Sequence, residues 1–337
     1  MLARRCTSAR DVATLAQLAP EIRAVAVTML QVDAGAGLVA RTLSALNDVL
    51  TVRVIDLVFA RHRLPTASWC WLALGSEGRG EQTFVTDQDN GIIFNAVDAT
   101  EARALRPLFM ACAGEVNQAL DDCGFPLCEG GIMAGQADCC LSLAEWQDRF
   151  VSWIRTPEPQ ALLNATIFFD MRALHGDARL VDALRGHLAL WLEGGDAFLR
   201  MLTGNALAAE PPLGFLRDFD APEGLVDLKK LGARLFVDAA RIMGIGCAES
   251  STSARLRHAV VAGKFPGGEG EAFLAAFHHL QRIRLQVQYQ AFAVGGTPAN
   301  LVDPQALNPF DRRILHEAFK QARLLQQRLK TTYRIEG

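Results

Sequence analysis

The feature that most constrains the fold is the stretch Trp69–Glu81, followed closely by Thr86–Phe94. The first stretch opens with an apolar run and breaks into a Gly-Ser pair, which predicts a buried strand and a tight turn. A short glycine-broken helix or loop should follow. The second stretch begins with two aspartates one residue apart and continues as an apolar run, which predicts a second strand.

The aspartates of the second strand are spaced to share one face. Successive side chains of a strand point to opposite faces, so Asp87 and Asp89 should emerge together, with Gln88 turned away. Two neighbouring carboxylates repel each other unless a cation lies between them. Mg²⁺, or Mn²⁺ in its place, suits such a pair because it completes a shell of hard oxygen ligands with water and substrate phosphates. The spacing therefore predicts a divalent metal at Asp87 and Asp89.

The turn before the aspartates carries groups that suit a phosphate. Gly75 lets the backbone approach a phosphate closely, and the N–H groups of Gly75 and Ser76, with the Ser76 hydroxyl, can donate to it. Arg79 adds a guanidinium that can bind phosphate through two N–H groups. Beside a metal-binding acid pair, this turn predicts a nucleoside triphosphate that is attacked in line.

Each half of the motif also has a simpler interpretation. A Gly-Ser turn after an apolar strand is usually a plain loop. Asp-x-Asp-x-Gly could begin a calcium-binding EF-hand loop, but that loop needs Gly at its sixth position and Glu at its twelfth. This chain has Ile92 and Asp98 there. With both halves present, the spacing favours a nucleotide site over a structural turn with exposed acids.

A Gly-Ser pair, a short spacer and an Asp-x-Asp that opens a strand resemble the nucleotidyltransferase superfamily of DNA polymerase beta. The string LGSEGRGEQTFVTDQDNGIIF resembles one branch more closely, the nucleotidyltransferases related to PII-protein uridylyltransferase, often fused to CBS and cyclic-nucleotide-binding domains. The resemblance covers most of the chain through four later motifs: CEGGIMAG (128–135), SLAEWQDRF (142–150), IFFDMRALHGD (167–177) and VDLKKLGARLFVDAARIMGI (226–245).

This resemblance implies transfer of a nucleoside monophosphate from an NTP to a hydroxyl of an unknown protein or small-molecule acceptor, in uridylyltransferase- or adenylyltransferase-like signalling. It also implies a third carboxylate on a later strand, which takes the acceptor's proton; the one acid in the strand expected at 125–134 is Glu129. The regulation that such relatives carry in extra domains would be supplied in trans by another subunit, or it has been lost. The alternative function is a nucleotide-sensing or interaction module with little chemistry.

The composition and the absence of other motifs argue against several other classes of protein. Half of the 337 residues are apolar, enough for a large core, and a net charge of −3 gives no general attraction to nucleic acid or membrane. No apolar run approaches the length of a membrane span and no signal peptide is recognisable, so a cytoplasmic protein is expected. The eight cysteines include no Cys-x-x-Cys, and the chain has no Walker loop and no G-x-G-x-x-G fingerprint.

The predicted fold is α+β and mostly helical, in three parts. Residues 1–65 should form an N-terminal helical region with a break at Gly35–Gly37, closed by Pro65. Residues 66–140 should form the nucleotidyltransferase-like α/β domain, with a helix over 99–123 and a short strand over 125–134. Residues 141–337 should be helical to the end and bind substrate.

Two basic residues of this C-terminal part are further candidates for the site. Arg172 lies near Asp170 after an apolar run, and Lys229 lies near Asp227 at the head of a helix. Acids and bases placed in this way most often form structural ion pairs. The functional interpretation is that Arg172 or Lys229 binds the nucleotide by reaching the triphosphate, or reaches the acceptor.

Overall fold

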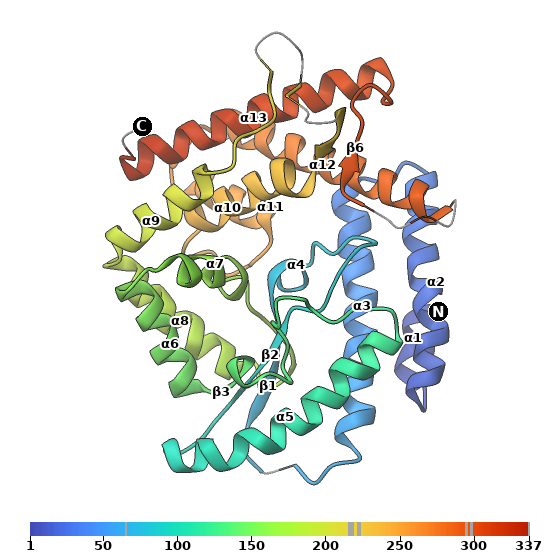
Figure 1. Ribbon diagram of the computed structural model, residues 1–337, viewed down its shortest axis with the longest axis vertical. Helices are drawn as coiled ribbons and strands as arrows, with labels where there is room; N and C mark the ends of the chain where they lie inside the picture. The colour runs from blue at the N-terminus through green and yellow to red at the C-terminus, as the bar shows by residue number, and fades with distance from the viewer. Residues whose placement is uncertain (65, 215–218, 221–223, 294–295, 297–298, 336–337) are drawn as a thin grey trace. The chain divides into compact units, whose positions relative to one another are not determined.

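Figure 1 shows a computed structural model of the chain, which describes residues 1–64, 66–214, 219–220, 224–293, 296 and 299–335. The chain divides into two compact units: Met1–Val32 with Val39–Glu193, and Asp33–Leu38 with Gly194–Gly337. Helices dominate both units, and the strands form one four-stranded and one two-stranded sheet. The predicted mostly helical α+β class is confirmed.

Three helices precede the first strand: α1 (Leu2–Ser8), α2 (Val12–Gln31) and α3 (Ala36–Phe59). Helix α2 begins where the Asp11 side chain accepts the Thr14 N–H at 2.7 Å, a typical N-cap. A break separates α2 from α3, as the nearby glycines predicted. Pro65 lies outside the described residues. Among those that are described, no helix combines the length and the apolar composition needed to cross a membrane.

The sheet of the first unit has the strand order β3-β2-β1-β4. Strand β1 (Trp69–Ala73) lies antiparallel to both β2 (Asn90–Phe94) and β4 (Arg172–Gly176), while β2 pairs in parallel with β3 (Cys140–Ser142). Strands β1 and β2 are almost entirely buried, which explains their continuous apolar sequence. The two predicted strands are therefore confirmed, although the β2 ladder starts directly after the aspartates.

Two other predictions about strands are wrong. The segment 125–134 forms no strand, because a turn at Cys128–Gly131, closed by the Gly131 N–H to the Cys128 carbonyl at 3.0 Å, interrupts it. The chain after residue 141 is also not helical throughout, because β4 pairs with β1 in the same sheet. Most of β4 is only half-buried, so it lacks the apolar run that identifies β1.

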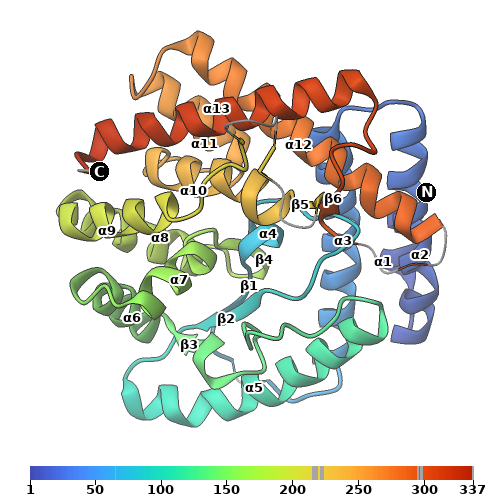
Figure 2. The same cartoon turned by 45° about the horizontal axis from the view of Figure 1, so that its top comes forward.

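Helices cover both faces of the sheet. Helix α5 (Ala99–Asp122) packs on one face (Figure 1 and Figure 2). On this face Phe109 stacks on Phe94 with ring centroids 5.1 Å apart. Helix α6 (Leu143–Arg155) packs on the other, where Trp146 lies against Gly91 and donates to the Ile92 carbonyl at 3.0 Å. Helix α7 (Pro159–Phe168) leads to β4, and α8 (Arg179–Glu193) completes the unit.

The second unit is built from helices α9 (Asp196–Leu207), α10 (Arg234–Met243), α11 (Thr252–Val261), α12 (Gly267–Ala293) and α13 (Pro309–Tyr333). Strands β5 (Val226–Asp227) and β6 (Leu301–Val302) pair antiparallel, and a π-helical turn, η3 (Lys229–Ala233), precedes α10. Phenylalanines of α9, α10, α12 and α13 are fully buried: Phe198, Phe236, Phe273 and Phe319. Ser251 caps α11 by accepting the Ala254 N–H at 3.3 Å.

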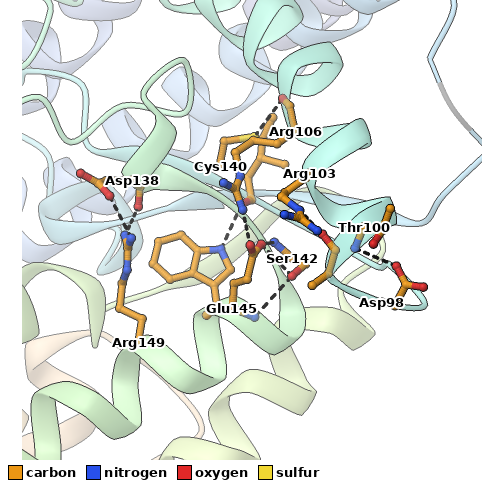
Figure 3. A network of polar contacts seen from close by, with 12 residues as sticks. Asp98, Thr100, Arg103, Arg106, Asp138, Cys140, Ser142, Glu145 and Arg149 are labelled. Carbon is orange, nitrogen blue, oxygen red and sulfur yellow. Dashed lines mark hydrogen bonds and ion pairs between the residues drawn. The ribbon is translucent and has the colours of Figure 1, made fainter.

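The N-terminus of α6 is fixed by a capping box (Figure 3). The Ser142 hydroxyl accepts the Glu145 N–H at 3.3 Å, and the Glu145 carboxylate accepts the Ser142 N–H at 2.9 Å. We expect Ser142→Ala to lower the free energy of unfolding by about 1 kcal/mol, because the Glu145 N–H loses its acceptor. Urea denaturation measures the change. Ser152→Ala, at an exposed position of the same helix, is the control, and an equal effect of both would contradict the role of the cap.

Candidate functional site

Strand β1 ends in the turn that the sequence singled out. Residues Gly75–Gly78 form a single helical turn, α4, in which the Gly78 N–H donates to the Leu74 carbonyl at 2.8 Å. Gly75 has a φ of +51°, in the left-handed region that favours glycine. A Cβ on Gly78 would lie 2.0 Å from the Asp170 carbonyl oxygen, so this position also accepts only glycine.

Asp89 lies directly beside this turn. The Leu74 N–H donates to the Asp89 carbonyl at 2.9 Å, and a Cβ on Gly75 would lie 2.6 Å from Asp89 Oδ2. The Asp89 carboxylate therefore occupies space that exists because residue 75 has no side chain. Asp89 is half-buried and Asp87 is exposed. The phosphate-type turn and Asp89, which the sequence separates, adjoin in the structure.

Gln88 is turned away from its neighbours. Its side chain is buried, and its amide nitrogen donates to the Asn117 and Phe125 carbonyls at 2.9 and 2.8 Å. The Asn117 amide nitrogen donates to Gln88 Oε1 at 2.8 Å and to Asn90 Oδ1 at 2.9 Å. Gln88 and Asn90 therefore face α5, and the alternation of an extended chain directs Asp87 and Asp89 to the opposite face.

Arg79 is held by two carboxylates. Its Nε donates to Glu81 at 2.8 Å and its Nη1 to Asp170 at 2.5 Å. Asp170 is fully buried, and a buried charge requires a partner of this kind. The predicted phosphate clamp therefore belongs to an ion-pair network that joins α4 to the segment before β4. The ion pair of Asp170 is formed with Arg79, whereas the sequence suggested Arg172.

Arg172 links three elements at the same end of the sheet. It stands opposite Ala73 of β1, and its Nη2 donates to Asp48 of α3 and to the Glu77 carbonyl of α4, both at 3.0 Å. A guanidinium suits this task because its several N–H groups diverge in one plane. Arg172 is therefore placed to hold α4 against α3.

Helix α3 supports the chain between the turn and the aspartates. The Ser44 hydroxyl accepts the Gln82 N–H at 3.0 Å, and the Asn47 amide donates to Gln82 Oε1 at 3.1 Å. Asn47 and Asp48 follow Ser44 by three and four residues, so all three share one side of the helix. The polar side of α3 therefore fixes residues on both flanks of Arg79.

Glu77 is a residue of this site that the sequence analysis missed. It is 7% exposed within α4. Burial, with a smaller contribution from the Asp48 carboxylate, raises the pKa of Glu77 to about 8, while Arg172 opposes this shift. The carboxyl is therefore protonated at neutral pH. Its position directly after the Gly-Ser pair was the one available signal, and sequence alone does not reveal its burial.

Glu129 lies in the exposed turn Cys128–Gly131. The chain on both sides of this turn is hydrogen-bonded to residues 87–90, here called the aspartate segment. The Gln88 N–H donates to the Pro126 carbonyl and the Asn90 N–H to the Ile132 carbonyl, each at 3.1 Å. The Cys128 thiol lies 3.6 Å from Asp89 Oδ1. The turn that carries Glu129 therefore borders the acid pair.

Lys229 belongs to the second unit, where its side chain is exposed. The Asp227 carboxylate accepts the N–H groups of Lys229 and Lys230, both at 2.9 Å, and so caps the π-helical turn. The ion pair of Asp227 is formed with Lys230, at 4.0 Å. The first unit thus contains all the predicted site residues except Lys229.

The donor set suits a metal that is shared with a substrate. Asp87 and Asp89 provide hard oxygen ligands, and Asp87 is open to solvent. Within the described part of the chain, no group of three or more His, Cys, Asp and Glu side chains is arranged to hold a metal. Mg²⁺ is often held by one or two carboxylates plus substrate phosphates, so the residues present fit such a site.

The raised pKa of Glu77 predicts a pH-dependent stability. Its ordinary value is 4.5, whereas the folded protein keeps the proton up to a pH of about 8. The folded state binds more protons between these two values, so the free energy of unfolding should fall as the pH rises through this window. The contribution of this group is at most about 1.4 kcal/mol per pH unit.

Glu77→Gln should remove this contribution and flatten the pH dependence over the same window. Urea denaturation at a series of pH values measures it, with the exposed Glu193→Gln as the control variant. Parallel curves for wild type and Glu77→Gln would contradict a buried, protonated carboxyl.

Two family models match the chain. The model described as "Putative nucleotidyltransferase DUF294" matches residues 20–160, and "Putative nucleotidyltransferase substrate binding domain" matches residues 196–333. A search of curated proteins finds no match. The first match contains α4 and both aspartates, and the second runs from the start of α9 to the end of α13. Since the two models together span most of the chain, the protein belongs to this nucleotidyltransferase family, whose general activity is nucleotidyl transfer.

Proposed function

We propose that the protein transfers a nucleoside monophosphate from an NTP to a hydroxyl of a protein or small-molecule acceptor, with release of pyrophosphate. The observation that carries this proposal is the contact between Gly75 and the Asp89 carboxylate. A structural turn has no need of a carboxylate in the space left by a missing side chain. A transferase needs both groups there, because the triphosphate must reach the backbone and the metal together.

The turn and the acids would bind different parts of the substrate complex, the turn its phosphate oxygens and the acids its divalent cation. The first N–H groups of a helical turn have no acceptor within that turn, so those of Gly75 and Ser76 suit phosphate oxygens. A divalent cation, Mg²⁺ or Mn²⁺, would neutralise charge on the attacking and leaving oxygens. Asp89 is positioned for this task by the Leu74 N–H, which binds its carbonyl at 2.9 Å.

The arginines of the first unit and the lysine of the second are assigned different tasks. Arg79 and Arg172 hold α4 in place through Asp170 and Asp48, so their effect on the nucleotide is exerted through the turn. Lys229 is proposed to contact the triphosphate or the acceptor. The description of the matched C-terminal model as a substrate binding domain supports a role of this unit in recognition. The resemblance to PII-protein uridylyltransferase favours uridylyl or adenylyl transfer.

A second candidate function is a nucleotide sensor with little chemistry. The observation that favours it is the position of Glu129, which lies in an exposed turn and on no strand. A general base must lie within hydrogen-bond reach of the proton that it removes. The transferase proposal assigns this role to Glu129 because its turn borders Asp89.

NTP binding should require a divalent cation, because two uncompensated carboxylates would repel a triphosphate. Titration calorimetry of each NTP, with Mg²⁺ and then with EDTA, measures this dependence. Equal affinity under the two conditions would remove the metal from the proposal.

Gly75→Val should abolish this binding, because the new side chain would meet the Asp89 carboxylate and strain a φ of +51°. Asp89→Asn removes the charge without adding bulk and should have the same result. Gly186→Ala is the control, since a Cβ there meets no atom within 4 Å. Near-ultraviolet circular dichroism reports whether each variant is folded. Normal NTP binding by folded Gly75→Val would show that the turn is only structural.

Glu129→Gln separates the enzyme from the sensor. If Glu129 is the general base, the variant should keep metal-dependent NTP binding and lose roughly 10²-fold in transfer rate, measured as pyrophosphate release. Glu193→Gln, which alters an exposed acid at the end of α8, should transfer normally. A wild type that binds NTP but releases no pyrophosphate with any acceptor, and a Glu129→Gln variant that behaves identically, would support the sensor.

A further inference from the structure

A second polar site lies in the first unit, on α5. It is an open groove of about 490 Å³ lined by Arg103, Arg106, Pro107, Met110, Ala111 and Gly135. The lining residues include two cations and no carboxylate. The groove thus combines a cationic edge with apolar side chains, a combination that suits an anion with an organic body.

The two arginines are only partly neutralised. Arg106 donates to the Glu145 carboxylate, which the capping box also uses (Figure 3), while its Nε is buried and has no hydrogen-bond partner among the described residues. Arg103 is exposed, its Nε donates to the Ala99 carbonyl at 3.2 Å, and no carboxylate in the described part of the chain pairs with it. The groove therefore keeps a net positive charge.

Phosphate is the anion that such a pair recognises best. A guanidinium presents its N–H groups in a planar fork that matches the oxygens of a phosphate, and the Arg103 charge is not compensated by a carboxylate of the described residues. Pro107 and Met110 offer apolar contact to the remainder of the molecule. A small organic phosphate therefore fits the groove better than a bare ion.

The groove lies on the α5 side of the aspartate segment, opposite the carboxylates. Hydrogen bonds nevertheless link the wall of the groove to that segment. The Gly135 N–H in its wall donates to Asn117 Oδ1 at 2.9 Å, and Asn117 in turn binds Gln88 and Asn90. A Cβ on Gly135 would lie 2.9 Å from the backbone of Gly114, so this wall is packed tightly against α5. A ligand that shifts Gly135 would therefore act on hydrogen bonds that lead through Asn117 to the residues on either side of Asp89.

We propose that this groove binds a small organic phosphate as an effector, and that its occupancy changes the affinity of Asp87 and Asp89 for a divalent cation. The second half rests on the proposed function, and the first half does not. Because coupling between two sites is reciprocal, the cation should change the affinity for the phosphate by the same factor.

The first experiment tests the groove alone, with the full chain in EDTA. Calorimetry should show that ribose 5-phosphate binds more tightly than inorganic phosphate and that ribose does not bind. Arg103→Gln should weaken ribose 5-phosphate binding by about tenfold, roughly the worth of one charge-assisted contact. Arg4→Gln, an exposed arginine of α1, should leave it unchanged. Unchanged affinity in Arg103→Gln, equally tight binding of malonate, or no phosphate binding would overturn the site.

The second experiment tests the coupling. Free Mn²⁺ is measured by electron paramagnetic resonance with and without ribose 5-phosphate, and the wild-type Mn²⁺ affinity should change by about fivefold or more. Arg103→Gln should abolish this response. Bound phosphate with an unchanged Mn²⁺ affinity would refute the coupling and leave the groove in place. A wild type that binds no Mn²⁺ in the absence of NTP would contradict the coupling, while phosphate binding in EDTA would still support the groove.

Discussion

The hydrogen bond from the Leu74 N–H to the Asp89 carbonyl, at 2.9 Å, is the contact on which the candidate site depends. It extends the β1–β2 pairing by one step beyond Ala73 and Asn90. One residue later β1 leaves the sheet through Gly75, whose positive φ turns the chain into α4. The register of β1 against β2 therefore places Asp89 beside the turn. This register is strongly specified because β1 and β2 are buried.

The charges around α4 are arranged to hold this turn. Asp170 binds Arg79, which follows α4 directly, and Asp48 binds Arg172, which donates to the Glu77 carbonyl of α4. Buried ion pairs contribute little net stability, because desolvation offsets the attraction, but they fix a geometry when both partners are present. Glu77 is mostly protonated at neutral pH, since its pKa is raised to about 8. The negative charge nearest the turn therefore stays concentrated on the aspartates, where a cation would use it.

Sequence patterns predicted the parts of this site that depend on neighbouring residues. The alternation at Asp87, Gln88 and Asp89 follows from strand geometry alone, and the apolar runs of β1 and β2 need no partner to be recognised. Strand β4 was missed because its pairing with β1 joins residues far apart and its exposure hides the pattern. The Arg79–Asp170 pair was missed for the same reason, and the strand expected at 125–134 was lost to the turn before Gly131.

The aspartate segment carries two kinds of polar side chain, amides and carboxylates, that point in opposite directions. On one side, the amides of Gln88 and Asn90 are buried and hydrogen-bonded to Asn117, which ties the backbone to α5. On the other side, the carboxylates of Asp87 and Asp89 do not tie the backbone to α5. A shift of register by one residue would bury the carboxylates against α5 and expose the amides, and uncompensated buried charges are far more costly than buried amides. The amide side therefore enforces the register that presents the acids, and a change on the α5 side of this segment would act on the carboxylates through the backbone that both sides share.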